Sequence, residues 1–319
     1  MNLRDLRYFV AIAETLHFGK AAERCFVSQP TLSGQLRKLE ESLGVTLFER
    51  TSKSVTITPI GTSLLAHARR TLEEADALTE AARTHRDPLA DPLRLGALPT
   101  ISPYLMPLIL RPLRERHPQL RLVLSEELTQ QLLERLDKHE LDAALIATPV
   151  DDPDLVARPL FDEPFWLAHP SNHPLYTKES ITRADLESLD VLMLAGGHCL
   201  ADQVREVCRL AERKSEGAMA DLRAASLETL LQLVGAGFGC TLVPALAMRG
   251  TWMTDAGVVV RKLDLPDAYR RVSLVWRRTF PRAAALEVVM EAILANLPNT
   301  VRPLDREGNP VAVTRRPRR

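Results

Sequence analysis

Two cysteines, Cys199 and Cys208, are the residues whose type and spacing most directly suggest chemistry in this sequence. They follow a pair of glycines that ends a predicted buried strand, and the composition after the glycines predicts a helix beginning near Cys199. A thiol at a helix N-terminus lies beside unpaired N–H groups and the positive end of the helix dipole, which favour its thiolate form. His198 and Arg205 can add positive charge nearby. Because thiolates attack peroxides, the pattern predicts a reactive thiol at Cys199.

The spacing of the two cysteines conflicts with a disulfide between them. If the segment is one continuous helix, nine residues separate the thiols by a rise of about 13.5 Å. A disulfide requires Cα atoms within roughly 7 Å, so the helix would have to unwind before the bond could form. A redox switch needs such a conflict. Two other interpretations remain: both thiols are small buried hydrophobic groups, or they bind a metal with His198, although the spacing matches no usual zinc pattern.

The sequence pattern of residues 92–297 predicts the domain that positions these cysteines. Short apolar runs predict strands at 93–98, 120–124, 142–147, 164–168, 191–194, 240–243 and 271–276, with helices at 104–116, 129–138, 227–234 and 283–297. This alternation is typical of an α/β domain with a largely parallel sheet, which binds ligands at the carboxyl ends of its strands. Thr100 and Thr129 are therefore expected to face a ligand crevice, although either one can instead cap a helix.

The first 60 residues predict a compact helical domain. Apolar residues spaced three and four apart predict a helix at the start, residues 18–23 a second one, and Ser28 and Pro30 open a third. The residues left for the outer faces of this third helix are mostly polar or basic: Gln29, Pro30, Thr31, Ser33, Gln35, Arg37 and Lys38. Such side chains can contact base edges and phosphates, as in a helix-turn-helix that enters the major groove. An ordinary helical corner with a solvated face is the competing interpretation.

The next segments favour the DNA-binding interpretation. Residues 47–59 alternate around a basic turn and predict a β-hairpin, the wing of a winged helix, from which Arg50 and Lys53 would reach phosphates. From Gly61 onward, apolar or small residues at 64/65, 68, 72, 75, 78 and 82 approach the repeat of a coiled coil. A helix packed on its own domain can show the same pattern. Because the predicted helix precedes a proline-containing segment at 87–92 that breaks the helical pattern, a connector helix that forms dimers is favoured.

Charge is distributed unevenly, although the chain holds 41 basic and 41 acidic residues. Residues 1–70 contain ten Lys and Arg against six Asp and Glu, a net charge of +4. Residues 301–319 contain six Arg against two acidic residues, again +4, so the section between them carries −8. This asymmetry suggests that the basic parts meet a polyanion such as DNA.

Composition and missing motifs exclude several classes of protein. Hydrophobic residues make up 45% and charged residues 26%, which is typical of a globular chain, and four cysteines are too few for a disulfide scaffold. The charged start predicts no signal peptide, and glycines and a proline interrupt the uncharged stretch 229–248, so we expect a cytoplasmic protein without a membrane partner. Without nucleotide, metalloprotease or serine-hydrolase motifs, neither an enzyme nor a bound cofactor is expected.

Four short motifs resemble the winged-helix signature of bacterial LysR-type transcriptional regulators. They are His17-Phe18-Gly19-Lys20-Ala21-Ala22, Ser28-Gln29-Pro30-Thr31-Leu32-Ser33, Leu39-Glu40-Glu41-Ser42-Leu43-Gly44 and Leu47-Phe48-Glu49-Arg50. The resemblance extends to about residue 300. It implies an α+β protein with a winged helix-turn-helix over 1–60, a linker and dimerisation helix over 61–90, and a two-lobed α/β regulatory domain of the periplasmic-binding-protein type over 91–300. It also implies a homotetramer, a dimer of dimers. Beyond it, the Arg-rich composition of 301–319 predicts a disordered tail.

A narrower resemblance is to the hydrogen-peroxide-sensing OxyR branch of that family. It is carried by Leu98-Pro99-Thr100, the segment at Thr129, and Gly197-His198-Cys199-Leu200-x-Asp202-Gln203 with Cys208 beyond it. The resemblance implies that Cys199 attacks peroxide to form a sulfenic acid, that Cys208 resolves it to a disulfide, and that cellular thiol reductants reset the protein. The residues implied to bind or polarise the peroxide are Thr100, Thr129, His198, Asp202 and an arginine that matches Arg270 or Arg271.

The predicted function is a transcription activator that converts peroxide into changed contacts with double-stranded operator DNA and RNA polymerase. Two other functions fit the same sequence: a LysR-type regulator with a small organic effector in its crevice, and a thiol peroxidase. Cys25 and Cys240 are interpreted as packing residues. The sequence names neither the operator nor the target genes.

Overall fold

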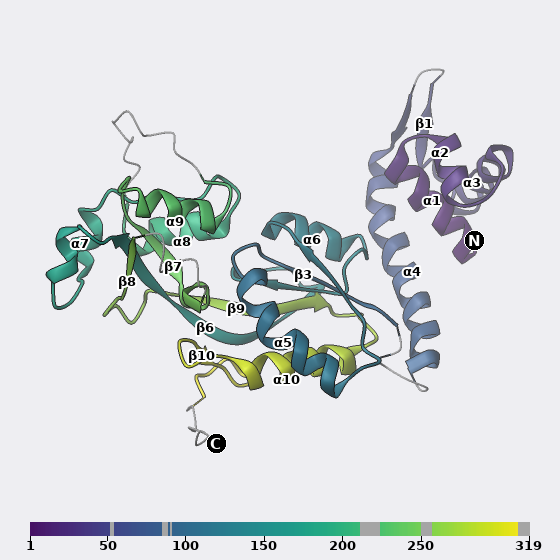
Figure 1. Cartoon of the computed structure of the whole chain (residues 1–319). Coiled ribbons are helices and arrows are strands. Elements are labelled where there is room, and N and C mark those ends of the chain that lie inside the picture. Colours follow the sequence, from purple (N-terminus) through teal and green to yellow (C-terminus); the bar gives the residue numbers. More distant parts are fainter. Residues whose placement is uncertain (52–53, 85–88, 90, 211–223, 250–256, 312–319) are drawn as a thin grey trace. The chain divides into compact units, whose positions relative to one another are not determined.

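The computed structural model describes residues 1–51, 54–84, 89, 91–210, 224–249 and 257–311. The chain divides into two compact units, Met1–Asp87 and Pro88–Arg319, which are described separately below. The elements are labelled in Figure 1. None of the helices in the described residues combines the length and hydrophobicity needed to cross a bilayer.

The N-terminal unit has the winged helix-turn-helix fold predicted from the sequence. Its elements are α1 (Leu3–Thr15), α2 (Phe18–Arg24), α3 (Gln29–Leu43), β1 (Phe48–Arg50), β2 (Val55–Ile57) and α4 (Pro59–Thr84). The predicted Ser28 cap is confirmed, since its side chain accepts a hydrogen bond from the Thr31 N–H at the start of α3. Strands β1 and β2 pair antiparallel as the wing.

Aromatic and aliphatic side chains from α1, α2, α3, β1 and α4 form the core of this unit. Phe9 of α1 and Phe48 of β1 meet edge to face with ring centroids 5.6 Å apart. The first half of α4 packs against the same core through Leu64, Leu65, Ala68 and Leu72. The competing interpretation of the long helix, packing on its own domain, is therefore correct for this half. Further along α4, Leu78 is 76% exposed.

The C-terminal unit has two lobes with separate hydrophobic cores (Figure 1). Lobe I contains β3 (Leu93–Ala97), α5 (Ser102–Arg116), β4 (Leu122–Glu126), α6 (Thr129–Asp137), β5 (Ala143–Ile146), β9 (Tyr269–Arg277), α10 (Ala283–Asn296) and β10 (Arg302–Pro303). Lobe II contains a short 3-10 helix (Pro174–Thr177), α7 (Arg183–Glu187), α8 (Cys199–Val207), α9 (Leu227–Gly235), β7 (Thr241–Pro244) and β8 (Val258–Lys262). A second 3-10 helix (Ala245–Arg249) contributes Ala245 and Leu246 to the core of lobe I and Ala247 to that of lobe II. The long strand β6 (Leu155–Pro170) belongs to both lobes.

The expectation of a largely parallel sheet is wrong. Strand β3 is parallel to β4 and β5, but β5 pairs antiparallel with β9, and all four partners of β6 run antiparallel to it. The reason is that the chain crosses between the lobes and returns through long strands, which local apolar runs do not reveal. The predicted strand at 191–194 is also reduced to single bridges at Val191 and Leu194.

Strand β6 changes partners where the lobes meet. It pairs with β9 of lobe I up to Pro164 and with β7 of lobe II from Phe165 onward. Its register with β9 sets Asp162 opposite Arg271 and Glu163 opposite Arg270. Because successive side chains of a strand point to opposite faces, these neighbouring pairs lie on opposite sides of the sheet.

The prediction of a disordered tail is wrong for residues 301–311. Strand β10 pairs antiparallel with β6. Val301 is buried in the core of lobe I, and Leu304 is buried next to β10. The Leu304 N–H donates to the Leu160 carbonyl at 2.8 Å. Hydrophobic anchors next to the arginines therefore keep this segment in place. The rest of the predicted tail, 312–319, lies outside the described residues.

Candidate redox site and DNA-binding surface

Helix α8 begins at Cys199, as predicted, and Cys208 is its C-terminal cap residue. Gly197 has a φ of +95°, a left-handed conformation that favours glycine and lets the chain turn into the helix. His198 occupies the N-cap position without making a side-chain capping bond. Both cysteines are free thiols. The helix therefore holds the two thiols apart at its opposite ends.

The two ends of α8 pack against different cores. Cys199 is half-buried and packs against the core of lobe I, while Cys208 is fully buried in the core of lobe II, together with Leu200 and Val204 of the same helix. Burial raises the pKa of the Cys208 thiol to about 12, although the charge of Arg183 acts in the opposite direction. In this state Cys208 is a protonated, inaccessible thiol.

Cys199 has a different electrostatic environment. Burial raises its pKa and is the largest effect, while the Arg270 guanidinium, the Thr129 hydroxyl and the Leu200 N–H favour the thiolate. The nearby Asp202 carboxylate adds to the rise. The expected net lowering by the helix N-terminus is therefore wrong for this state, because desolvation of the sulfur outweighs it.

The cation beside the thiol also differs from the expectation. Burial lowers the pKa of His198, so its imidazole is neutral at neutral pH. Arg205 pairs with Asp202 at 2.6 Å instead of facing the sulfur. The Asp202 side chain is 81% exposed, and it acts on the Cys199 thiol through its charge. Arg270, from a strand 70 residues away in sequence, supplies the positive charge.

Arg270 is held by a dense set of hydrogen bonds. Its Nη1 donates to Thr100 Oγ1 at 2.8 Å and its Nη2 to the Thr100 carbonyl at 2.7 Å. Its Nε donates to Glu163 Oε2 at 2.9 Å. Thr100 thus fixes the arginine that acts on the thiol. Arg271 does not join this group, because it lies on the other face of β9 and forms a two-pronged pair with Asp162.

Two buried polar atoms near the thiol can each form a further hydrogen bond. Thr129 Oγ1 and Gln203 Oε1 are both buried without a hydrogen bond of good geometry. The other end of the Gln203 amide is fixed, since Nε2 donates to the Ala147 carbonyl at 2.6 Å. Gln203 lies one helical turn from Cys199, so both side chains lie on one face of α8. Gln203 is not among the predicted site residues, although its spacing from Cys199 in the sequence is a signal for such a role.

Comparison with known proteins places this arrangement in a family. The family model "LysR substrate binding domain" matches residues 86–298, and "Bacterial regulatory helix-turn-helix protein, lysR family" matches residues 3–62. The DNA-binding transcriptional dual regulator OxyR of Escherichia coli (strain K12) is 44% identical over 299 residues, covering 93% of this chain and 96% of that protein. The chain belongs to the OxyR family of LysR-type regulators.

Solved OxyR structures share the fold of this chain. A full-length mutant of OxyR from Pseudomonas aeruginosa matches with a TM-score of 0.73 and 39% identity, covering 92% of this chain and 94% of that one. A mutant of Corynebacterium glutamicum OxyR, described as H₂O₂-bound, matches with a TM-score of 0.62 and 37% identity, covering 92% of each chain. The winged helix-turn-helix and the two-lobed domain are thus features of the OxyR family.

The predicted DNA-contacting side chains of this OxyR-family chain lie mostly on the exposed side of α3. Gln29, Pro30, Thr31, Arg37 and Lys38 are exposed, while Ser33 and Gln35 are half-buried. Lys53 lies outside the described residues.

Arg50 of the wing makes contacts within the unit that the sequence did not predict. Its Nη1 donates to Ser33 Oγ at 3.1 Å, its Nη2 lies 3.4 Å from Glu40 Oε2, and its guanidinium lies 4.5 Å from the centre of the Phe18 ring. Arg50 therefore ties the wing to α3 in addition to any contact with phosphate.

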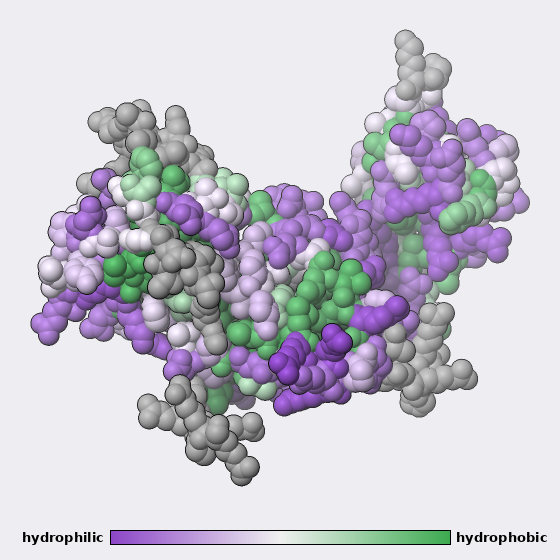
Figure 2. All heavy atoms as spheres, viewed as in Figure 1, coloured by the Kyte–Doolittle hydropathy of each residue, from purple (hydrophilic) through white to green (hydrophobic). Residues whose placement is uncertain are grey.

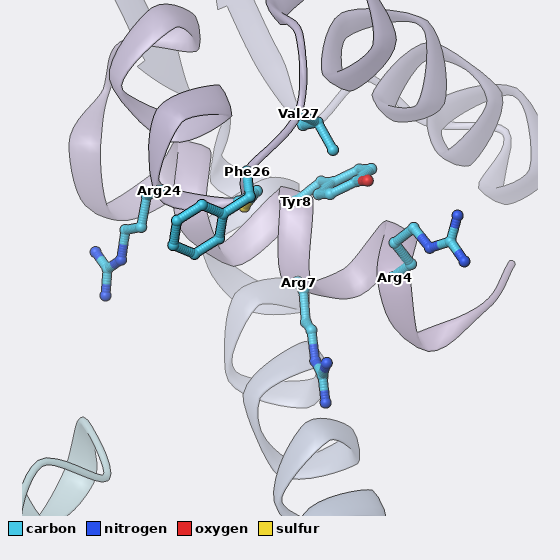
Figure 3. A pocket seen from close by; sticks show the side chains of 7 residues that line it. Arg4, Arg7, Tyr8, Arg24, Phe26 and Val27 are labelled. Atoms are coloured by element: carbon cyan, nitrogen blue, oxygen red, sulfur yellow. The ribbon is translucent and has the colours of Figure 1, made fainter.

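A hollow of about 440 Å³ lies on the N-terminal unit (Figure 3). It is lined by α1 and by the turn between α2 and α3, through Arg4, Arg7, Tyr8, Arg24, Cys25, Phe26 and Val27. Two of its arginines are already paired, Arg7 with Asp76 and Arg24 with Glu14. Burial raises the pKa of the Cys25 thiol, and the charge of Arg24 acts in the opposite direction. Cys240, the other cysteine interpreted as a packing residue, is buried in lobe II.

Proposed function

We propose that this chain is a transcription activator that senses hydrogen peroxide through a reversible disulfide between Cys199 and Cys208. The observation that carries the proposal is the position of the Cys199 thiol. It lies at the start of α8, where the Arg270 guanidinium and the Thr129 hydroxyl favour its thiolate and the buried Gln203 amide oxygen has no hydrogen-bond partner. Hydrogen peroxide is small and both donates and accepts hydrogen bonds, so it suits a hydroxyl and an amide oxygen.

The first step uses Cys199 as the nucleophile. Its thiolate attacks one peroxide oxygen, so that an S–O bond forms, the O–O bond breaks, and the leaving hydroxide takes a proton to become water. The product is the sulfenic acid of Cys199. Arg270 stabilises the negative charge of the thiolate and of the leaving hydroxide, while Thr129 and Gln203 orient the peroxide.

The second step requires the fold around α8 to change. The Cys208 thiolate attacks the sulfenic sulfur, an S–S bond forms, the S–O bond breaks, and hydroxide leaves as water. Because α8 keeps the two cysteines at its opposite ends, the helix has to unwind, and Cys208 has to leave the core of lobe II. A cellular thiol reductant restores both thiols, and the core then favours the helical state again.

The rearranged lobe is proposed to alter the assembly on DNA. Several exposed hydrophobic side chains support a homotetramer of this chain: Leu78 in the second half of α4, Leu110 of α5, and Val123 and Leu124 of the edge strand β4. Figure 2 shows hydrophobic residues gathered over α5 on the visible face. When the lobes shift, the spacing of the α3 helices on double-stranded DNA changes, and with it the contact with RNA polymerase.

Mass spectrometry of the cysteine-containing peptides tests this function. One equivalent of hydrogen peroxide is expected to link the peptides of Cys199 and Cys208 in the wild-type chain. In Cys208→Ser, a sulfenic acid that reacts with dimedone should accumulate on Cys199. The matched control Cys25→Ser removes a thiol in the other unit and should leave the link unchanged.

Two results would contradict the proposal. One is the absence of the linked peptide after peroxide treatment of the wild-type chain. The other is steady consumption of peroxide with a thiol reductant at an enzymatic rate, which would make the protein a thiol peroxidase.

A further inference from the structure

A buried ion pair, Glu163 with Arg270, lies where the two lobes meet. Both side chains are 0% exposed, and Arg270 Nη2 lies 2.8 Å from Glu163 Oε2. The second carboxylate oxygen, Oε1, accepts a hydrogen bond from the Leu246 N–H at 2.7 Å. Both oxygens of Glu163 are therefore occupied, and the carboxylate is fixed by groups from two elements.

Arg270 interacts both with this carboxylate and with the Cys199 thiol. Glu163 binds the Nε side of the guanidinium, Thr100 binds Nη1 and Nη2, and the positive charge favours the thiolate of Cys199. The guanidinium thus has one permanent anionic partner, Glu163. A second anion appears only when Cys199 loses its proton.

We propose that Glu163 is a positioning residue for the peroxide reaction, the buried counter-ion that orients Arg270 and limits how much of its positive charge reaches Cys199. The inference rests on the proposed function, because it assigns Glu163 a role in the reaction of that thiol. A buried arginine needs an anionic partner, since an unpaired charge inside a protein is strongly destabilising. The partner that satisfies this need also offsets part of the field that stabilises the thiolate.

Other charged and titratable groups near the thiol do not duplicate this role. The Asp202 carboxylate of α8 also raises the pKa of Cys199, but it is exposed and pairs with Arg205, not with Arg270. His198 is neutral at neutral pH. Tyr104 of α5 lies near both Arg270 and Glu163, but its hydroxyl donates to Glu228 of α9 at 2.6 Å. Thr129 of α6 carries no charge. Among the described residues, Glu163 is the carboxylate that ion-pairs with Arg270 directly.

The test is the substitution Glu163→Gln in the full chain, with the Cys199 pKa measured from the pH dependence of peptide-resolved alkylation by iodoacetamide. Glutamine keeps the volume and removes the charge, so the thiolate becomes the one available counter-ion of Arg270. The pKa of Cys199 is expected to fall by about one unit, which means roughly tenfold more thiolate near neutral pH. The rate of reaction with hydrogen peroxide is expected to rise by a similar factor.

Asp162→Asn is the matched control. Asp162 is the preceding residue of β6 and pairs with Arg271 on the other face of the sheet. This variant should leave the pKa of Cys199 unchanged. A pKa that stays the same or rises in folded Glu163→Gln, or one that falls equally in Asp162→Asn, overturns the proposal.

A second comparison covers the case in which Glu163→Gln does not fold. In an Arg270→Gln background, Glu163 is a buried carboxylate without a cation, which protonates, so adding Glu163→Gln should change the Cys199 pKa by no more than a few tenths of a unit. A fall of a full unit in that background shows that Glu163 does not act through Arg270, and it overturns the proposal. Alkylation requires no peroxide, so these outcomes stay distinct from a failure of the proposed sensing function.

Discussion

The two ends of α8 place the same functional group in opposite surroundings. At the N-terminal end, Cys199 is half-buried against lobe I and has Arg270 and the Thr129 hydroxyl to stabilise its charge. At the C-terminal end, Cys208 is fully buried in lobe II, and burial raises its pKa to about 12. Packing in the core of lobe II therefore keeps the Cys208 thiol protonated and inaccessible. In the proposed function, Cys199 reacts first and Cys208 becomes reactive only when α8 unwinds.

The largest expected effect comes from removing either thiol. Cys199→Ser should slow the reaction with hydrogen peroxide by several orders of magnitude, because among the cysteines in the described part of the chain Cys199 combines an arginine with stabilising hydrogen bonds from a hydroxyl and a backbone N–H. Cys208→Ser should react at close to the wild-type rate but stop at the sulfenic acid. Stopped-flow measurement of peroxide consumption with mass spectrometry separates the two.

Cys240→Ala is the control for that comparison. Cys240 is another buried thiol of lobe II, with a pKa that burial raises to about 11, but it lies outside α8. Its removal should leave the products unchanged. Equal loss of peroxide reactivity in the Cys199 and Cys208 variants would mean that the two ends of α8 do not differ as described.

Removing Arg270 should reduce the difference in thiol reactivity between the two ends of α8. In Arg270→Gln the Cys199 pKa should rise further above its ordinary value, and the peroxide reaction should slow by roughly 10- to 100-fold. The unfolding free energy should fall by about 3–5 kcal/mol, because the buried Glu163 loses its partner. Urea unfolding and alkylation measure both effects.

Arg271→Gln provides the matched comparison at a partly exposed pair. The Arg271 side chain is 42% exposed, whereas its partner Asp162 is buried, so the loss in stability should be about 1–2 kcal/mol, smaller than for Arg270. If both arginine variants were equally stable and equally reactive, the position of Arg270 beside the thiol would have no functional consequence.

The sequence predicted the features that depend on local pattern. Apolar periodicity and the Ser28 cap predicted α1, α3 and the wing, and the glycine pair before Cys199 predicted the start of α8. The long-range contacts were not predictable from spacing. Glu163 reaches Arg270 only through the register of β6 with β9, which no local pattern encodes.

The dependence on long-range contacts also explains the incorrect predictions. The helix N-terminus alone suggested a lowered pKa for Cys199, but the pKa is raised because the lobe I core desolvates the sulfur, and that core is assembled from distant segments. The sequence also left Arg270 and Arg271 as equal candidates. The alternation of β9 distinguishes them, since it sends one side chain to the buried side and the other toward solvent.

A smaller effect is expected from Gln203, which lies between the two ends of α8. Gln203→Ala removes the unpaired amide oxygen near Cys199 and the hydrogen bond to Ala147, so the peroxide reaction should slow by about tenfold. The pKa of Cys199 should stay close to that of the wild type, because the amide carries no charge. Comparison of the peroxide rate with the iodoacetamide rate checks this, and equal slowing of both would contradict a role in orienting peroxide.

The smallest effect concerns stability at alkaline pH. The folded chain holds the Cys208 proton up to a pKa of about 12, whereas an exposed thiol titrates near 9.0. This contribution to stability is complete below pH 9 and is lost as the pH rises toward 12, since only the unfolded chain then releases the proton. Between pH 8 and pH 10.5, the urea midpoint of unfolding should therefore fall less in Cys208→Ala than in the wild type. An identical fall in both proteins would contradict the burial assigned to this thiol.

Hydrogen exchange of the backbone amides of α8 tests the central claim most directly. The wild-type chain is measured before and after one equivalent of hydrogen peroxide, with Cys208→Ser treated in the same way. We expect the peptide spanning Cys199 and Cys208 to lose its protection in the oxidised wild type, because the disulfide requires the helix to unwind. Cys208→Ser should keep its protection. A disulfide that forms while α8 stays protected would contradict the account.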